Sequence, residues 1–177
     1  MSRTSAAVIV SCAMAEEAQP FVDALPERTE AQPPTLPGSA QAWSLQLPGG
    51  ERELILVRSG IGLVAAASAL AAVLTQVRPG TIVSAGTTGG LGRQVQVGDV
   101  CASANLAYTD ADATAFGYVR GQTPGQPETF AGDPALLERL EQVGPEALRG
   151  ATASSGSARL HVGRMLAGNS FVTAANV

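Results

Sequence analysis

The chain has 177 residues, of which 45% are hydrophobic and 15% charged, and a formal net charge of −4, which is the composition of a globular protein with one core. All eleven basic residues are arginines, spread from Arg3 to Arg164 without a cluster. This distribution argues against a nucleic-acid-binding stripe and against a polybasic membrane patch.

The apolar runs are short. The longest, over 64–74, is far below the roughly 20 residues that cross a bilayer. The apolar start of the chain includes Ser11 and Cys12 and is too short and too polar for a secretion signal. We therefore expect a cytoplasmic protein with neither a membrane nor a nucleic-acid partner. Cys12 and Cys101 are expected as small core residues, and nothing in the composition requires a cofactor or a metal.

Short apolar segments alternate with helical patterns through the first half of the chain. The prolines and the Pro48-Gly49-Gly50 turn separate these segments. In chain order we expect a strand over 8–11, a helix over 15–24, a loop over 26–38, strands over 43–47 and 54–57, a helix from Gly60 to about Val77 and a buried strand over 81–85. The apolar face of the second helix is predicted to consist of Val64, Ala67, Leu70, Leu74 and Val77.

The second half continues the same alternation. A strand over 97–107 opens with the Gly98-Asp99 turn, and a helix over 133–143 has Asp133 as its cap and Pro134 at its first position. A loop of small residues over 150–157 and a strand over 160–167 follow. Strands that alternate with helices predict an α/β protein, a three-layer α/β/α sandwich around a central mixed sheet, with residues 1–177 as a single domain.

Four segments carry polar residues or glycines at the expected strand ends, where α/β proteins bind ligands. They are Ala13-Met14-Ala15-Glu16-Glu17, Ser59-Gly60-Ile61-Gly62, the glycine-rich elbow from Ser84 to Leu91, and Tyr108 to Tyr118. The last of these mixes aromatic and acidic residues without any period, as a loop shaped for contact would. In order and in spacing, from Val8 to about Val172, these segments resemble the 5′-methylthioadenosine/S-adenosylhomocysteine nucleosidases of the nucleoside phosphorylase superfamily.

The resemblance implies a nucleoside phosphorylase-like fold and hydrolysis of the N-glycosidic bond of 5′-methylthioadenosine and S-adenosylhomocysteine, with release of adenine. Such a reaction needs a carboxylate to activate water and an acid to protonate the departing base. By position, Glu17 matches the acid that activates the water in this family. Without the resemblance, Glu16 and Glu17 would be ordinary acids in the first turn of a helix, and Glu16 keeps that interpretation.

The resemblance also implies a set of substrate-binding residues. Thr87, Thr88 and Gly89 would lie against the purine and ribose, although the family usually has Ser-Ala where this chain has Thr87-Thr88. Met14 and Ile61 would line the sugar. Phe171, otherwise an ordinary core residue, would stack on the adenine, and the backbone of Val172 would bind its edge. In a homodimer, a lid on the partner's 5′-alkylthio pocket would come from Phe116, Tyr118 and Pro124.

Other chemistries are less favoured by the residues. Asp110 and Asp112 lack the further ligands of a metal site, and His161 has no Ser or Cys partner that a motif would reveal. Phosphorylase relatives usually place an arginine just before the elbow, where this chain has Ser84, so water is the expected nucleophile.

The family continues past the position of Val177, through a ribose-binding Met-Glu pair and a Ser-Asp pair that protonates adenine. We therefore expect the sequence to be a fragment, truncated at its C-terminus. Two alternatives stay open: a related purine nucleosidase, such as a futalosine hydrolase, or a phosphorylase, and a non-catalytic module for nucleoside binding or dimerisation.

Overall fold

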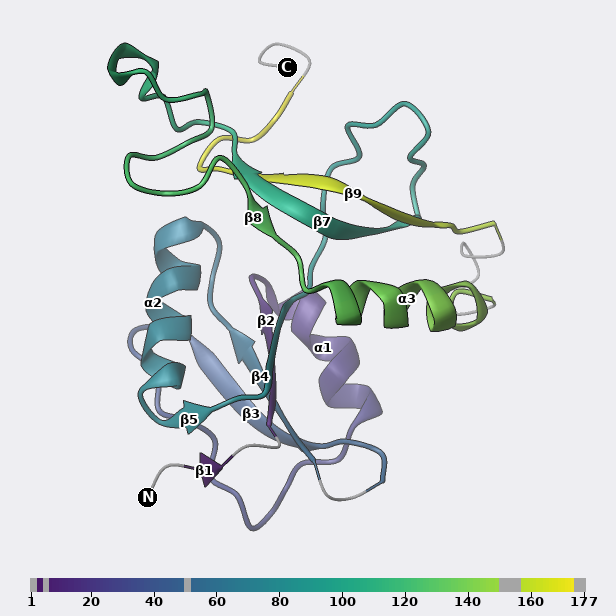
Figure 1. Cartoon of the computed structure of the whole chain (residues 1–177). Helices are drawn as coiled ribbons and strands as arrows, with labels where there is room; N and C mark the ends of the chain where they lie inside the picture. The colour runs from purple at the N-terminus through teal and green to yellow at the C-terminus, as the bar shows by residue number, and fades with distance from the viewer. Residues whose placement is uncertain (1–2, 5–6, 50–51, 150–156, 174–177) are drawn as a thin grey trace. The chain divides into compact units, whose positions relative to one another are not determined.

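The computed structural model describes residues 3–4, 7–49, 52–149 and 157–173 (Figure 1). Its contacts divide the chain into two compact units, Met1–Thr88 and Gly89–Val177, and each is described by itself. Both units combine helices with a sheet, which confirms the predicted α/β class. That the two units form a single domain remains a prediction. Among the described residues, no helix is long and apolar enough to cross a membrane.

The first unit is built on a four-stranded mixed sheet with the order β3-β4-β2-β6. The central strand β2 (Val8–Cys12) pairs in parallel with β4 (Glu53–Arg58) and with β6 (Thr81–Ser84). Strand β3 (Gln41–Gln46) runs antiparallel to β4, as the predicted hairpin requires. A separate two-stranded ladder joins β1 (Arg3–Thr4) to β5 (Val77–Arg78).

Two helices cover opposite faces of this sheet, α1 (Ala15–Ala24) and α2 (Leu63–Leu74) (Figure 1). Successive side chains of a strand point to opposite faces, so the buried residues fall into two clusters. One cluster contains Ile9, Ile55, Val57, Ala69 and Val73, and the other Val10, Cys12, Ala18, Leu45, Leu54 and Leu56. The first unit therefore has the α/β/α layering that the alternation of elements predicted.

The predicted apolar face of α2 is wrong for most of its residues: Leu70 packs against the buried cluster, but Val64, Ala67 and Leu74 are exposed. The helix ends at Leu74 and buries Ala69 and Val73, whereas Val64 is 80% exposed and Val77 lies in β5. Half of the residues of α2 are alanine, and apolar residues occur on all sides of the helix. Hydrophobic periodicity therefore could not show which face packs against the sheet. The expectation that β6 is buried also fails, since Ile82 and Val83 are 43% and 38% exposed on the last strand of the sheet order.

The second unit has a three-stranded sheet with the order β8-β7-β9. Strand β7 (Val100–Tyr108) runs parallel to β9 (Leu160–Ala167) and antiparallel to the short β8 (Phe130–Ala131). A single 3₁₀ turn (Thr114–Phe116) lies in the long segment between β7 and β8. The predicted loop over 150–157 lies, except for its last residue, outside the described residues.

Helix α3 (Pro134–Ala147) begins as the sequence predicted and runs past the predicted end at Val143. The Asp133 carboxylate accepts hydrogen bonds from the backbone N–H of Ala135 and Leu136, at 2.9 and 3.0 Å. Both donors belong to the first turn, where the helix itself supplies no partner.

A carboxylate also ties the beginning of β7 to that of β9. Asp99 accepts hydrogen bonds from the backbone N–H of Gln96 (3.0 Å) and Arg159 (2.9 Å), and it pairs with Nε2 of His161 at 2.7 Å. The two backbone donors, followed by His161, lower the pKa of Asp99 to about 2. His161 thus has an acidic partner just before β7, which sequence spacing did not reveal.

Val73→Ala should lower the free energy of unfolding by about 2 kcal/mol, because two fully buried methyl groups are lost and a cavity remains. Val64→Ala makes the same chemical change on the same helix at an exposed position and should change stability by less than about 0.5 kcal/mol. Urea unfolding of the two variants measures the difference. Equal losses would contradict the packing of α2 through Ala69 and Val73.

The Asp99 carboxylate should make folding sensitive to acid. Its pKa in the folded protein lies below the value of about 3.9 in an unfolded chain, so it stabilises the fold above about pH 4, and this contribution disappears as the pH falls towards 2. Asp99→Asn should reduce stability near neutral pH and flatten its decline between about pH 4 and 2. Denaturant titrations at several pH values test this, with the exposed Glu128→Gln as the control. An unchanged slope in Asp99→Asn would refute the linkage.

Candidate functional site

Three of the four segments singled out in the sequence meet at one edge of the first unit's sheet. The three parallel strands end there, and each is followed by one of the segments. Backbone hydrogen bonds hold these ends together: Ser59 N–H donates to Cys12 O (2.9 Å), Gly60 N–H to Ala13 O (3.1 Å) and Ala85 N–H to Ser11 O (2.9 Å). Residues 13–17, 59–62 and 84–88 are thereby brought to the same edge.

Glu17 occupies the middle of this edge, and its carboxylate accepts four hydrogen bonds. Oε2 receives the backbone N–H of Ala13 and Met14, at 2.9 and 3.0 Å. Oε1 receives the backbone N–H and the hydroxyl of Thr87, at 2.7 and 2.8 Å. The carboxylate therefore has two donors on each oxygen.

Only half of this arrangement belongs to an ordinary helix start. Met14 is the N-cap of α1 and Glu17 its third residue, so the contact of Oε2 with the Met14 N–H is the reciprocal bond of a capping box. A cap does not account for Oε1, whose partner comes from 70 residues further along the chain. Glu17 thus joins the beginning of α1 to the elbow after β6, whereas Glu16 is exposed, in accord with its interpretation as an ordinary first-turn acid.

The electrostatics of the site favour the charged carboxylate. Partial burial raises the pKa of Glu17, but the hydrogen bonds from Thr87 and then those from Met14 and Ala13 outweigh it, so the pKa lies below the ordinary value. Donors that bind the charged form stabilise it. Glu17 is therefore an anion at neutral pH, as a group that accepts a proton must be.

Gly86 is a residue of this site that the sequence did not single out. A Cβ at position 86 would lie 2.8 Å from Oε1 and 2.9 Å from Cδ of Glu17. Only glycine lets the elbow approach the carboxylate this closely. The glycine-rich composition of 84–91 was the available signal, but it could not show which glycine faces Glu17.

Met14 and Ile61, predicted to line the sugar, border one depression of about 430 Å³ at the same sheet edge. Most of its lining residues come from the ends of β2 and β4 and the segments that follow them: Ala13, Met14, Ala15, Glu16, Ser39, Arg58, Gly60 and Ile61. Ile61 is 69% exposed, so its apolar side chain is available for contact. Thr88, at the end of this unit, is exposed as well.

The remaining predicted residues, Gly89 among them, belong to the second unit, where two loops leave β7 and β9 side by side. Oδ2 of Asp110 accepts the backbone N–H of Asn169 at 2.8 Å, and a Cβ at Gly168 would collide with the Thr109 hydroxyl oxygen. These contacts fix the exit of β9, which leads directly to Phe171 and Val172. Phe171 is 85% exposed in the part of the chain that the structure describes.

The segment with the predicted lid residues also has its own internal contacts. Asp112 accepts the hydroxyl and backbone N–H of Thr114, at 2.8 and 3.1 Å, and forms an ion pair with Arg120 at 2.9 Å. The acids of this segment thus order a loop. Phe116 is 80% exposed, Pro124 is exposed and Tyr118 is half-buried.

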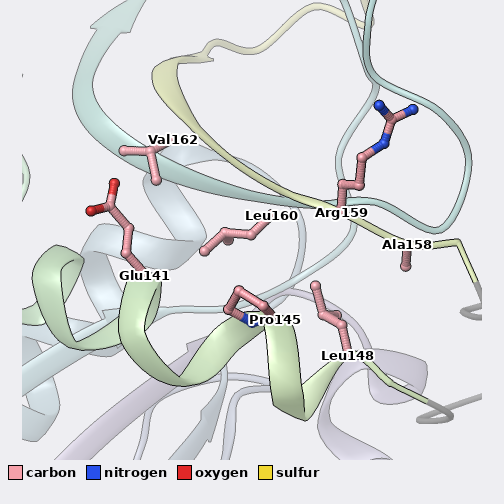
Figure 2. Close-up of a pocket in the computed structure, with 7 residues that line it drawn as sticks. All are labelled: Glu141, Pro145, Leu148, Ala158, Arg159, Leu160 and Val162. Carbon is pink, nitrogen blue, oxygen red and sulfur yellow. The ribbon is translucent and has the colours of Figure 1, made fainter.

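A second cavity, of about 590 Å³, lies between α3 and β9 (Figure 2). Its lining combines apolar residues with two charged ones and contains none of the predicted site residues: Glu141, Pro145, Leu148, Ala158, Arg159, Leu160 and Val162. Gly144 lets the helix approach this strand, since a Cβ there would lie 3.1 Å from a methyl group of Leu160. Its two charged side chains, Glu141 and Arg159, do not point toward one another (Figure 2), so this cavity is a poorer candidate site than the edge at Glu17.

Comparison with known proteins leads to the same family as these residues do. The Phosphorylase superfamily matches residues 7–175. A 5′-methylthioadenosine/S-adenosylhomocysteine nucleosidase of Actinobacillus succinogenes is 33% identical over 160 residues, which are 90% of this chain and 63% of that protein. This chain spans only 55% to 63% of the length of this protein and two nucleosidases of Haemophilus influenzae.

Solved structures of such nucleosidases share the fold. The Neisseria meningitidis enzyme in complex with methylthio-immucillin-A has a TM-score of 0.80 and 30% identity, and the match covers 95% of this chain and 67% of that one. The enzyme of Colwellia psychrerythraea in complex with adenine has a TM-score of 0.79 and 30% identity, with coverages of 98% and 66%. The chain belongs to the phosphorylase superfamily, as a relative of its 5′-methylthioadenosine/S-adenosylhomocysteine nucleosidases.

Proposed function

We propose that the full-length protein hydrolyses the N-glycosidic bond of 5′-methylthioadenosine and S-adenosylhomocysteine and releases adenine, with Glu17 as the base that activates water. The observation that carries this proposal is the Glu17 carboxylate, which is charged and fixed by four donors at the ends of three parallel strands. The names of the relatives, and the adenine in one related structure, support the choice of substrate.

The reaction transfers one proton to Glu17. A water attacks C1′ of the ribose, the bond from C1′ to the adenine nitrogen breaks, and the carboxylate accepts a proton from the water. The departing adenine must itself be protonated, a role that the resemblance gives to the Ser-Asp pair of the family. A rigidly held carboxylate suits this chemistry because the water and the sugar carbon must be aligned when the bond breaks.

Water is favoured over phosphate as the nucleophile. The elbow over 84–91 contains no cationic residue, and Ser84 stands where phosphorylases usually have an arginine. A phosphate dianion near the Glu17 carboxylate would be repelled, whereas water is not. These two features support a hydrolase.

We assign the remaining contacts by the resemblance. Phe171 stacks on the adenine and the backbone of Val172 binds its edge; Thr87, Thr88 and Gly89 approach the purine and ribose; Met14 and Ile61 line the sugar. The exposed apolar side chains of Ile61 and Phe171 support these roles, since an exposed apolar side chain is available for contact with a ligand. A cytoplasmic location is part of the same proposal.

The function is tested by measuring adenine release from 5′-methylthioadenosine, S-adenosylhomocysteine, adenosine and futalosine, each with and without phosphate. We expect release from the two thioethers, independent of phosphate. If adenine release depended on phosphate, the protein would be a phosphorylase. If futalosine were the preferred substrate, the protein would be the related nucleosidase. If calorimetry showed tight binding of the thioethers and no adenine were released, the protein would be the non-catalytic module.

Glu17→Gln should lower turnover at least about a hundredfold, the usual scale for a positioned base, while the fold and much of the nucleoside affinity persist. The amide has only one oxygen for the three backbone donors of Ala13, Met14 and Thr87, so we also expect a stability loss of about 1 kcal/mol. Glu128→Gln makes the same change of charge at an exposed position outside the candidate site and should retain turnover within about twofold. Steady-state kinetics of both variants decide, and activity of Glu17→Gln above a tenth of the wild type would remove Glu17 from this role.

We also propose a homodimer whose interface includes Tyr108 to Pro124, with Phe116, Tyr118 and Pro124 forming the lid on the partner's 5′-alkylthio pocket. The exposed ring of Phe116 supports this, because a partner surface would cover it. Phe116→Ala should raise the dimer dissociation constant at least about tenfold in sedimentation experiments. Leu91→Ala, at an exposed apolar position outside the segment, is the control. A monomer at all concentrations would refute the dimer.

A further inference from the structure

Thr87 supplies half of the hydrogen bonds of the Glu17 carboxylate, although the two residues are 70 positions apart. Its backbone N–H and its hydroxyl both donate to Oε1, at 2.7 and 2.8 Å. These are the two shortest of the four contacts, since the bonds of Ala13 and Met14 to Oε2 measure 2.9 and 3.0 Å. The contact therefore depends on the side chain of Thr87 as well as on its backbone.

The capping bonds by themselves do not fix the second oxygen. A glutamate side chain has three rotatable bonds, and its last torsion is broad, so a carboxylate held through Oε2 can still turn Oε1 over a wide range. Two donors from Thr87 remove this freedom. We propose that Thr87 is the positioning residue of Glu17, and that its hydroxyl fixes the orientation of the carboxylate in which the reaction takes place.

The chain is built to place this hydroxyl accurately. Strand β6 is paired to β2 through Ser84 and Ser11, and the bond from Ala85 N–H to Ser11 O extends the pairing by one residue, so Thr87 follows closely on a fixed point. Threonine is branched at Cβ and has fewer rotamers than serine, which lowers the entropy lost when its hydroxyl is held. Gly86 keeps the elbow close enough for both bonds.

The charge of Glu17 depends on the same contacts. Burial acts to raise the pKa of this carboxyl, and the backbone and hydroxyl bonds from Thr87 are the largest influences that lower it. Loss of the hydroxyl should therefore move the pKa upward, towards the ordinary value, and a base with a higher pKa is protonated, and inactive, at a higher pH. If Thr87 only stabilised the fold, loss of its hydroxyl would not change the titration of Glu17.

The inference rests on the proposed function for its kinetic consequence, but it can be measured without any substrate. In the full-length protein labelled with ¹³C at the glutamate carboxyl carbons, the Glu17 signal is assigned by its absence in Glu17→Gln. We expect its titration midpoint to rise in Thr87→Val and to stay near the wild-type value in Thr87→Ser. Thr81→Val removes a hydroxyl from β6 and is the control for the substitution itself.

Kinetics give the second readout. In Thr87→Val the acid limb of kcat/KM should move to higher pH by the same amount as the NMR midpoint, and kcat on its plateau should fall about tenfold with a smaller change in KM. Thr87→Ser should restore both. An unchanged Glu17 midpoint in a folded Thr87→Val protein, or a loss of activity that Thr87→Ser does not restore, would overturn the proposal. A shifted midpoint in a protein without nucleosidase activity would support the contact and overturn the proposed function instead.

Discussion

The parallel pairing of β2 with both β4 and β6 is the constraint on which the candidate site depends. Because the three strands point the same way, their carboxyl ends lie along one edge, and the segments that follow them must begin there. The pairing is secured by burial on both faces: Ile9 packs towards α2, and Val10 and Cys12 pack towards α1. Residues separated by up to 70 positions, such as Glu17 and Thr87, thereby become neighbours and can form hydrogen bonds.

Glu17 shows how one carboxylate can serve the fold and the chemistry together. One oxygen completes the start of α1, which satisfies backbone donors that would otherwise lack partners, and the other is held by the elbow. As part of the helix cap, the Glu17 side chain is held in one position, and a base that activates water must be held in one position. The two roles are therefore compatible, and a cap formed by the third residue of a helix is a simple way to orient a base.

The second unit uses carboxylates for a different purpose. Asp99 joins the starts of β7 and β9, Asp110 holds the exit of β9, and Asp112 orders the loop that carries Phe116. Each acid accepts at least one backbone N–H that has no ladder partner: the donors to Asp99 and Asp110 lie in irregular segments, and the donor to Asp112 is Thr114, the first residue of the 3₁₀ turn. These acids explain why an acidic, aromatic loop without periodicity is ordered. They also explain why exposed rings such as Phe116 and Phe171 sit on a defined backbone.

The sequence by itself determined the elements with strong local signals. These are the bounds of α1, the start of α3 at the Asp133 cap, the β3–β4 hairpin and strand β9, because helix propensity, caps and turn residues act over a few positions. The order of the motifs also indicated Glu17. Only the tertiary structure decided which face of α2 packs, since a helix rich in alanine has no distinct apolar side, and that β6 is exposed. The partners of Glu17 at Thr87 and Gly86, and of Asp99 at His161, were likewise decided by strand pairing, because contacts across 60 or 70 positions follow from register and leave no mark in local composition.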